Sequence, residues 1–196
     1  MAEEIIDGTG SGKRAKVDTN NQLHVFGVTE TEQQQATDIG NSYNLNTGWV
    51  SLAAETAIMW FKNDEDTSFV VDAIAVGFDT GTQADIGTIT VVRNPTAGTM
   101  ITAAIAVSMN ENRNFGSSNT LATTTLVYKG ATGETFTDGS NIAIFAQSDT
   151  GRLFATVDFE LPKGSSIGIR VDPNLSSGTV NCYAVLIGYL KTSGNK

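Results

Sequence analysis

The stretch Ser68–Asn94 constrains the fold of this chain more than any other part of the sequence. It contains two runs rich in β-branched residues, Phe69–Phe78 and Ile86–Asn94, on either side of a segment rich in Asp, Gly and Thr. This pattern predicts two antiparallel strands joined by a loop. The first run is apolar at nearly every position, which predicts a central strand covered on both faces. The second alternates, so one of its faces is expected to be more polar.

The chain after Asn41 repeats this period-two pattern and has no comparable helical period. Turns rich in Gly, Asp, Pro and Ser separate the apolar runs. About ten strands of this kind predict an all-β fold, an antiparallel two-sheet sandwich that is jelly-roll-like. Besides the two runs above, the predicted strands are Tyr43–Ala53, Thr56–Lys62, Thr99–Ser108, Leu126–Tyr128, Ile142–Gln147, Gly151–Leu161, Ser166–Val171 and Val180–Leu190.

The sequence divides into an N-terminal arm and linker, residues 1–42, and a β-sandwich body, residues 43–196. Met1–Asn21 is predicted to be an extended arm, because Asp7–Arg14 has too many glycines for regular structure. Gln22–Val28 alternates weakly and predicts a short strand. Thr29–Gly40 is the best helix candidate, since Thr29 and Glu32 form a capping box, but it lacks an apolar stripe and fits a polar linker equally well.

The composition excludes several classes of protein. Hydrophobic residues make up 40%, enough for a core, whereas charged residues make up only 17% and the net charge is −9. An acidic chain lacks the basic face that a nucleic-acid-binding protein needs. The N-terminus has no signal-peptide pattern and no apolar run approaches the ~20 residues of a membrane helix. A soluble protein made in the cytoplasm is expected, with no membrane partner.

Cysteine and histidine are too scarce for common catalytic and metal sites. The one Cys, Cys182, lies in an apolar run and is expected to be a buried structural thiol, and no intrachain disulfide can form. The one His, His24, has no second His or Cys pair nearby to complete a metal site. The acidic turn Asn63–Asp66 lacks the spacing of a calcium loop. No cofactor and no metal are expected.

Two short motifs invite an enzymatic interpretation and fail it. Asp7–Arg14 resembles a phosphate-binding loop, but Asp7 and Arg14 replace its first Gly and its hydroxyl residue. Asp-Thr-Gly occurs at Asp79 and at Asp149, as in aspartic proteases, but the interval is too short for two lobes and both copies fit hairpin loops. A homodimeric protease using the first copy, and a glycosidase with paired carboxylates, remain open. The prediction is a protein that is not an enzyme.

Two segments are candidates for binding a partner protein. In the arm, Lys13, Arg14 and Lys16 concentrate positive charge in an acidic chain, which suits an acidic neighbour, although a solvated turn would look the same. Leu23 and Val25 could anchor the same segment if it adds to a partner's sheet edge.

The second segment is Met109–Thr124, the longest stretch without a clear period. Loops of this length in compact domains are usually functional or disordered. Arg113 and Phe115 stand among polar neighbours and are predicted interface anchors, with packing of the loop on its own body as the alternative.

The whole chain resembles a group of small virion structural proteins of tailed bacteriophages. The likeness is carried by six parts of the sequence: Asp7–Asp18 with Asn21–Val25, Tyr43–Gly48, Phe61–Asp66, Arg93–Gly98, Asn112–Leu121 and Leu161–Gly168. The resemblance implies a capsid decoration (cement) protein that binds the major capsid protein on the outer shell of the virion. In such families the protein is commonly a trimer, so a homotrimer is expected.

Two other functions compete with this one. The first is a host-recognition module on a head fibre or tail, and the second, from a different class, is a small hydrolase. The arm and the missing catalytic set favour a structural or recognition role over the hydrolase.

Overall fold

The computed structural model describes residues 31–79, 87–102, 105–106, 110–122, 124–147 and 152–191, together with the strand residues 4–6, 14–17 and 23–25. The chain divides into two compact units, Met1–Thr31 and Glu32–Lys196. Each unit is described by itself below.

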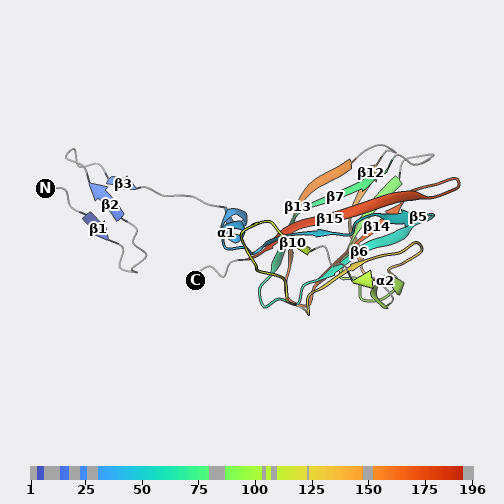
Figure 1. Ribbon diagram of the computed structural model, residues 1–196, viewed down its shortest axis with the longest axis horizontal. Helices are drawn as coiled ribbons and strands as arrows, with labels where there is room; N and C mark the ends of the chain where they lie inside the picture. The colour runs from blue at the N-terminus through green and yellow to red at the C-terminus, as the bar shows by residue number, and fades with distance from the viewer. Residues whose placement is uncertain are drawn as a thin grey trace. The chain divides into compact units, whose positions relative to one another are not determined.

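The first unit contains a small antiparallel sheet of three strands in the order β1-β2-β3 (Figure 1). These are β1 (Glu4–Ile6), β2 (Arg14–Val17) and β3 (Leu23–Val25). The strand predicted within Gln22–Val28 is confirmed as β3. Met1–Asn21, predicted to be an extended arm, contains β1 and β2, which pair with each other.

The second unit is a sandwich of two antiparallel sheets (Figure 1). One sheet has the order β10-β4-β15-β7-β13, with β5 also pairing β15. Its strands are β4 (Ser42–Asn46), β5 (Val50–Leu52), β7 (Phe69–Phe78), β10 (Asn110–Asn112), β13 (Arg152–Leu161) and β15 (Val180–Leu190). The other sheet has the order β12-β8-β14-β6-β11-β9. Its strands are β6 (Thr56–Lys62), β8 (Gly87–Arg93), β9 (Ile105–Ala106), β11 (Leu126–Lys129), β12 (Ser140–Gln147) and β14 (Ser166–Asp172).

The eight strands with the most extensive pairing have the topology of a jelly roll. Along the chain they are β4, β6, β7, β8, β12, β13, β14 and β15. The first, eighth, third and sixth of these are neighbours in one sheet, and the second, seventh, fourth and fifth in the other. That strand order is the arrangement of a jelly roll, with all pairings antiparallel. The predicted all-β sandwich is therefore confirmed.

The predicted pairing of Phe69–Phe78 with Ile86–Asn94 is wrong. These runs do form β7 and β8, but the two strands lie in different sheets. β7 pairs with β13 and β15, while β8 pairs with β12 and β14. The connection between them therefore passes from one sheet to the other, as a jelly roll requires.

Three further segments differ from the prediction. The run expected as one strand at Tyr43–Ala53 is divided between β4 and β5. The strand expected at Thr99–Ser108 begins instead as a short helix, α2 (Thr99–Thr102), followed by β9. The stretch Met109–Thr124, expected to have no regular structure, contains β10, which pairs with β4. The helix within Thr29–Gly40 is confirmed as α1 (Glu32–Asp38).

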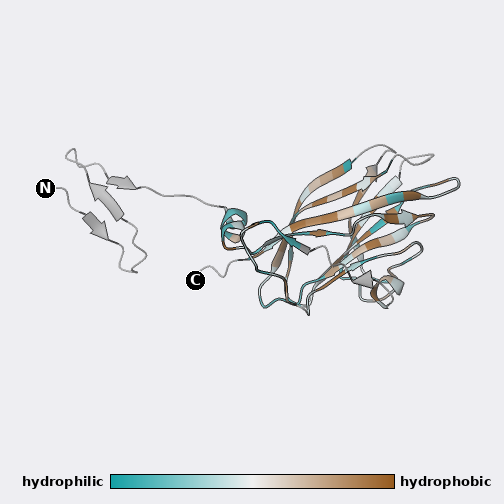
Figure 2. Cartoon of the chain, in the orientation of Figure 1, coloured by the Kyte–Doolittle hydropathy of each residue, from teal (hydrophilic) through white to brown (hydrophobic). Residues whose placement is uncertain are grey.

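The main core lies between the two sheets and is built from the inward-facing residues of both. Phe61 on β6 and Phe69 on β7 have no exposed surface, and their ring centroids lie 4.8 Å apart. Figure 2 shows hydrophobic stretches along these central strands, while α1 is mostly hydrophilic. Only Ala36 of α1 is buried, against Val70 and Tyr189 on the outer face of the first sheet.

Candidate interaction surface

The loop Asn112–Leu121 is held rigidly against the turn that follows α1. Three Asn side chains in the loop donate hydrogen bonds to backbone carbonyls of that turn. The bonds run from Asn112 to Gly40 (2.6 Å), from Asn114 to Asp38 (3.1 Å) and from Asn119 to Ile39 (3.0 Å). At the end of the loop, Leu121 is buried in the main core. The many Asn residues are there because short amide side chains satisfy backbone groups that no strand partner reaches.

This loop presents Phe115 to solvent. The side chain of Phe115 is 100% exposed, the most of any large hydrophobic residue described. The backbone on both sides of it is fixed, because Asn114 accepts hydrogen bonds from the N–H groups of Gly116 (3.0 Å) and Ser117 (2.9 Å). A large aromatic group on a rigid support loses little entropy on binding, which is the property of an interface anchor.

Arg113 lies two residues before Phe115 and is only half-buried. Its backbone N–H donates to the carbonyl of Ser42 at 2.9 Å, which continues the β10–β4 pairing by one residue. Its Nη1 atom is buried without a hydrogen-bond partner among the described residues. Both residues predicted as anchors therefore lie on this loop, but Phe115 is the exposed one.

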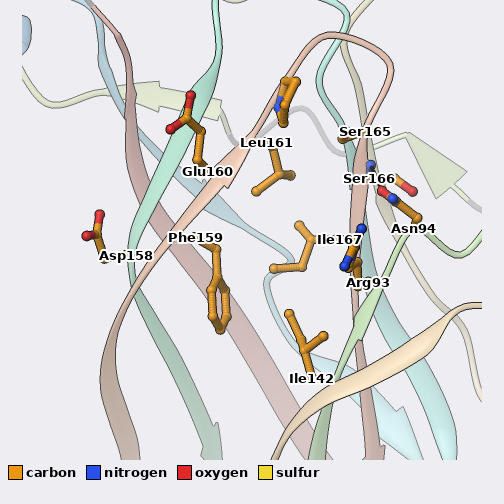
Figure 3. Close-up of a pocket in the computed structure, with 11 residues that line it drawn as sticks. Arg93, Asn94, Ile142, Asp158, Phe159, Glu160, Leu161, Ser165, Ser166 and Ile167 are labelled. Carbon is orange, nitrogen blue, oxygen red and sulfur yellow. Dashed lines mark hydrogen bonds between the residues drawn. The ribbon is translucent and has the colours of Figure 1, made fainter.

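The opposite edge of the same sheet borders a groove, which the sequence does not predict. β13 and β12 are the edge strands of the two sheets on this side of the sandwich. Between them lies a cavity of about 500 Å³. Its apolar lining consists of Ile142, Phe159, Leu161, Pro162 and Ile167 (Figure 3). We call this cavity the edge groove.

Irregularities in both edge strands shape the edge groove. β12 is bulged at Ile142, and β13 is bulged between Thr156 and Phe159. Two of the residues lining the groove, Asp158 (φ 51°) and Asn94 (φ 49°), have the positive φ that non-glycine residues seldom adopt. Bulges re-aim side chains and interrupt edge pairing, so these edges are poor templates for another strand but leave room for an inserted side chain.

Charge is distributed unevenly around the edge groove. Arg93 is exposed at one wall, and no ion pair joins it to another described residue. On the other wall, Asp158 and Glu160 project from the side of β13 away from Phe159 and Leu161 (Figure 3). Lys191 lies 2.7 Å from Glu160, and this hydrogen bond, together with one from Ser68, lowers the pKa of the Glu160 carboxyl below its ordinary value.

The strand register of the first unit places most of the candidate residues of the arm. Lys16 is opposite Glu4 on β1 and His24 on β3, and Arg14 is opposite Ile6. Leu23 and Val25 on β3 are opposite Val17 and Ala15 on β2. Lys13 lies outside the described residues.

Few residues in the described part of the chain suggest a catalytic site. Cys182 is fully buried, as expected, and burial raises the pKa of its thiol strongly. Asp79 accepts hydrogen bonds from the backbone and side chain of Asn181, as a structural residue does. The rest of the first Asp-Thr-Gly motif, all of the second and the Gly-rich Asp7–Lys13 stretch lie outside the described residues.

Neither a metal site nor a membrane-spanning helix is found among the described residues. No three His, Cys, Asp or Glu side chains in these ranges come together as a metal site would require. None of the helices described has the length and apolarity to cross a membrane.

A scan of protein-family models and a search of curated proteins find no match to this chain. The resemblance to phage virion proteins stays a prediction, and function has to be inferred from the fold and its surfaces.

Proposed function

We propose that this chain is a structural protein of a tailed-phage virion, and more specifically a capsid decoration protein that binds the major capsid protein on the outer shell. The proposal has three supports: the resemblance of six sequence segments, the jelly-roll topology and the exposed Phe115. Jelly rolls recur among viral capsid and lectin domains. This likeness of fold favours a role in a virus particle or in recognition.

Phe115 is the observation that carries the proposal. A folded chain gains nothing from a wholly exposed aromatic side chain on a loop fixed by Asn hydrogen bonds, unless a partner covers it. An enzyme would need titratable groups that converge on one site, whereas at the edge groove Asp158 and Glu160 project from β13 away from Phe159 and Leu161, and Glu160 is paired with Lys191. The role we propose is therefore non-enzymatic.

Image reconstruction of intact particles tests the proposed function. We expect density for the jelly roll on the outer shell, in contact with the major capsid protein. Density on a head fibre or on the tail would replace this proposal with a host-recognition module. Absence of the protein from purified particles would overturn both.

A binding assay with bare particles adds a residue-level test. Phe115→Ala should weaken decoration by at least about tenfold, whether Phe115 contacts the capsid protein or a neighbouring copy on the shell. Phe154→Ala is the matched control, because Phe154 is also a largely exposed Phe (62%) but lies on β13, outside the loop. Equal effects of the two substitutions would contradict a specific role for Phe115.

A further inference from the structure

We infer that two copies of this chain associate head to tail, with Phe115 of one copy inserted into the edge groove of the next. The inference deepens the proposed function and rests on it only for the expectation that the protein assembles. The two surfaces are distinct parts of one molecule, so the contact would be heterologous and would repeat from copy to copy.

The first support is the position of the two surfaces on one sheet. Pairing places Ser42 opposite Tyr189, Tyr189 opposite Val70, and Val70 opposite Glu160. At the other edge, the backbone N–H of Arg113 donates to the carbonyl of Ser42. These five residues therefore form one row across the sheet, from Arg113 at one edge to Glu160 at the other. The loop and the groove wall therefore lie at one level, at opposite edges of one sheet.

The second support is that a copy cannot fill its own groove. The row runs across five strands, and neighbouring strands are about 4.8 Å apart, so its ends are separated by about 19 Å. Phe115 is fixed at one end by the Asn114 and Asn119 hydrogen bonds. A second copy placed beside the first, with its strands in the same direction, has its Phe115 loop level with the groove of the first.

The third support is complementarity of shape and charge. The edge groove, about 500 Å³, is large enough to receive an aromatic side chain. Its accessible apolar surface comes from Ile142, which is 41% exposed, and from the partly buried Phe159, because Leu161 and Ile167 are buried. On the loop side, Glu111 is exposed on β10. On the groove side, Arg93 is exposed at one wall, whereas the acidic Asp158 and Glu160 project from β13 away from Phe159, so Arg93 is the groove charge that Glu111 can meet. The bulged edges disfavour strand-to-strand pairing as the alternative mode of association.

Site-specific cross-linking between two populations of the full chain tests the inference. One population carries Phe115→Cys and the other, with a different tag, carries Ile142→Cys, since Ile142 is a groove residue that is 41% exposed. Mild oxidation of the mixture should give a disulfide-linked dimer that contains both tags. The native Cys182 does not interfere because it is fully buried.

The control replaces Ile142→Cys with Phe154→Cys, an exposed position on the outer face of the same sheet edge. Random collision links both pairs equally, whereas the inferred contact links only the groove pair. Equal yields from the two mixtures would overturn the inference.

Sedimentation of the isolated protein gives an independent reading. Wild type should self-associate, and Phe115→Ala should weaken this association by at least about tenfold while leaving the urea unfolding midpoint unchanged, because Phe115 is wholly exposed. A wild type that stays monomeric at its solubility limit, or a variant that associates like wild type, overturns the inference. Neither result bears on where the protein lies in the particle. If Phe115→Ala abolishes particle binding but not self-association, Phe115 binds the capsid protein and the inference fails.

Discussion

The side-chain amide of Asn63 donates a hydrogen bond of 2.8 Å to the carbonyl oxygen of Leu161, 98 residues further along the chain. It also donates to the carbonyl of Thr67 at 3.0 Å, and the backbone N–H of Asn63 donates to Ser165 at 3.0 Å. Asn63 has no exposed surface. The buried Asn63 therefore connects the end of β6 to the end of β13 through its side chain, and to the turn that borders the edge groove through its backbone N–H.

Asn63→Ala should destabilise the body by about 3 kcal/mol, because it leaves buried backbone carbonyls without their donors. Urea unfolding monitored by tryptophan fluorescence measures the change. Asn141→Ala is the control, since Asn141 is exposed on β12 and its replacement should cost less than about 0.5 kcal/mol. A loss for Asn63→Ala no greater than for this control would contradict the role assigned to Asn63.

Strand positions can be predicted from this sequence, but strand partners cannot. The predicted bounds of β6, β7 and β15 match the structure to the residue, because their apolar runs end at sharp polar turns. A polar, Gly-rich link between two such runs looks the same whether it closes a hairpin or crosses between sheets. The sequence pattern therefore predicts that β7 and β8 pair, and only the packed core distinguishes the two connections.

The other differences also have local causes. Thr99–Thr102 has an apolar run like a strand, but Gly98 (φ 128°) turns the chain and Met100 packs beneath the sheet, which makes a short helix there. β10 is made of polar residues, because it is an edge strand and needs no apolar face.

The two proposed interface surfaces, the Phe115 loop and the edge groove, differ in how well they can be predicted from the sequence. Phe115 can be predicted because an aromatic residue among Asn, Gly and Ser is conspicuous. The edge groove cannot, since its bulges have no signature in residue type. Asp158 and Asn94 are of the types that adopt positive φ most readily, but most Asn and Asp residues do not adopt it, so residue type alone does not identify these positions. The exposure of Phe154 on β13 is likewise hidden, because alternation along a strand does not tell which face meets solvent.

The hydrogen bonds of the Asp138 carboxylate should make the stability of the body decrease at acidic pH. Its carboxylate accepts hydrogen bonds from the Thr96 hydroxyl and from the N–H groups of Ala97 and Thr96, which lower its pKa from the ordinary value of 3.8. A lowered carboxyl pKa stabilises the folded state at pH values above 3.8, and this contribution is lost as the pH falls through the folded-state pKa.

Asp138→Asn should therefore lower the urea midpoint at neutral pH, and the difference from wild type should shrink as the solution is acidified. Asp138 is exposed, so the effect is expected to be modest. Midpoints measured across that pH range check the sign. A difference that stays constant below pH 3.8 would mean that the substituted amide perturbs the turn by some route other than charge.

Cys182 should be unreactive in the folded protein. Burial, with a smaller effect from the Asp79 charge, raises its pKa, so the thiolate that reacts with disulfide reagents is scarce and inaccessible. Modification by a chromogenic disulfide reagent should be more than about a hundredfold slower in buffer than in denaturing urea. Comparable rates in the two solutions would show that β15 opens readily at this position.

The last prediction concerns the first unit. Its three strands have only three or four residues each, at the lower limit of strand length in globular proteins, so we expect a partner to stabilise this unit, with Leu23 and Val25 as candidate anchors. Deleting Met1–Asn21 should leave the body folded, because the core and all the sandwich pairings lie beyond Thr31. It should weaken attachment to the particle or to sister copies.

Replacing Lys13, Arg14 and Lys16 with Ser should weaken attachment in part, and more at low salt, where the attraction of positive charges for an acidic partner is least screened. Circular dichroism checks the fold of each variant, and co-sedimentation with bare particles measures attachment at two salt concentrations. If the deletion variant decorates particles with unchanged affinity, the first unit is not the attachment device, and attachment has to come from the body, with the Phe115 loop as the first surface to alter.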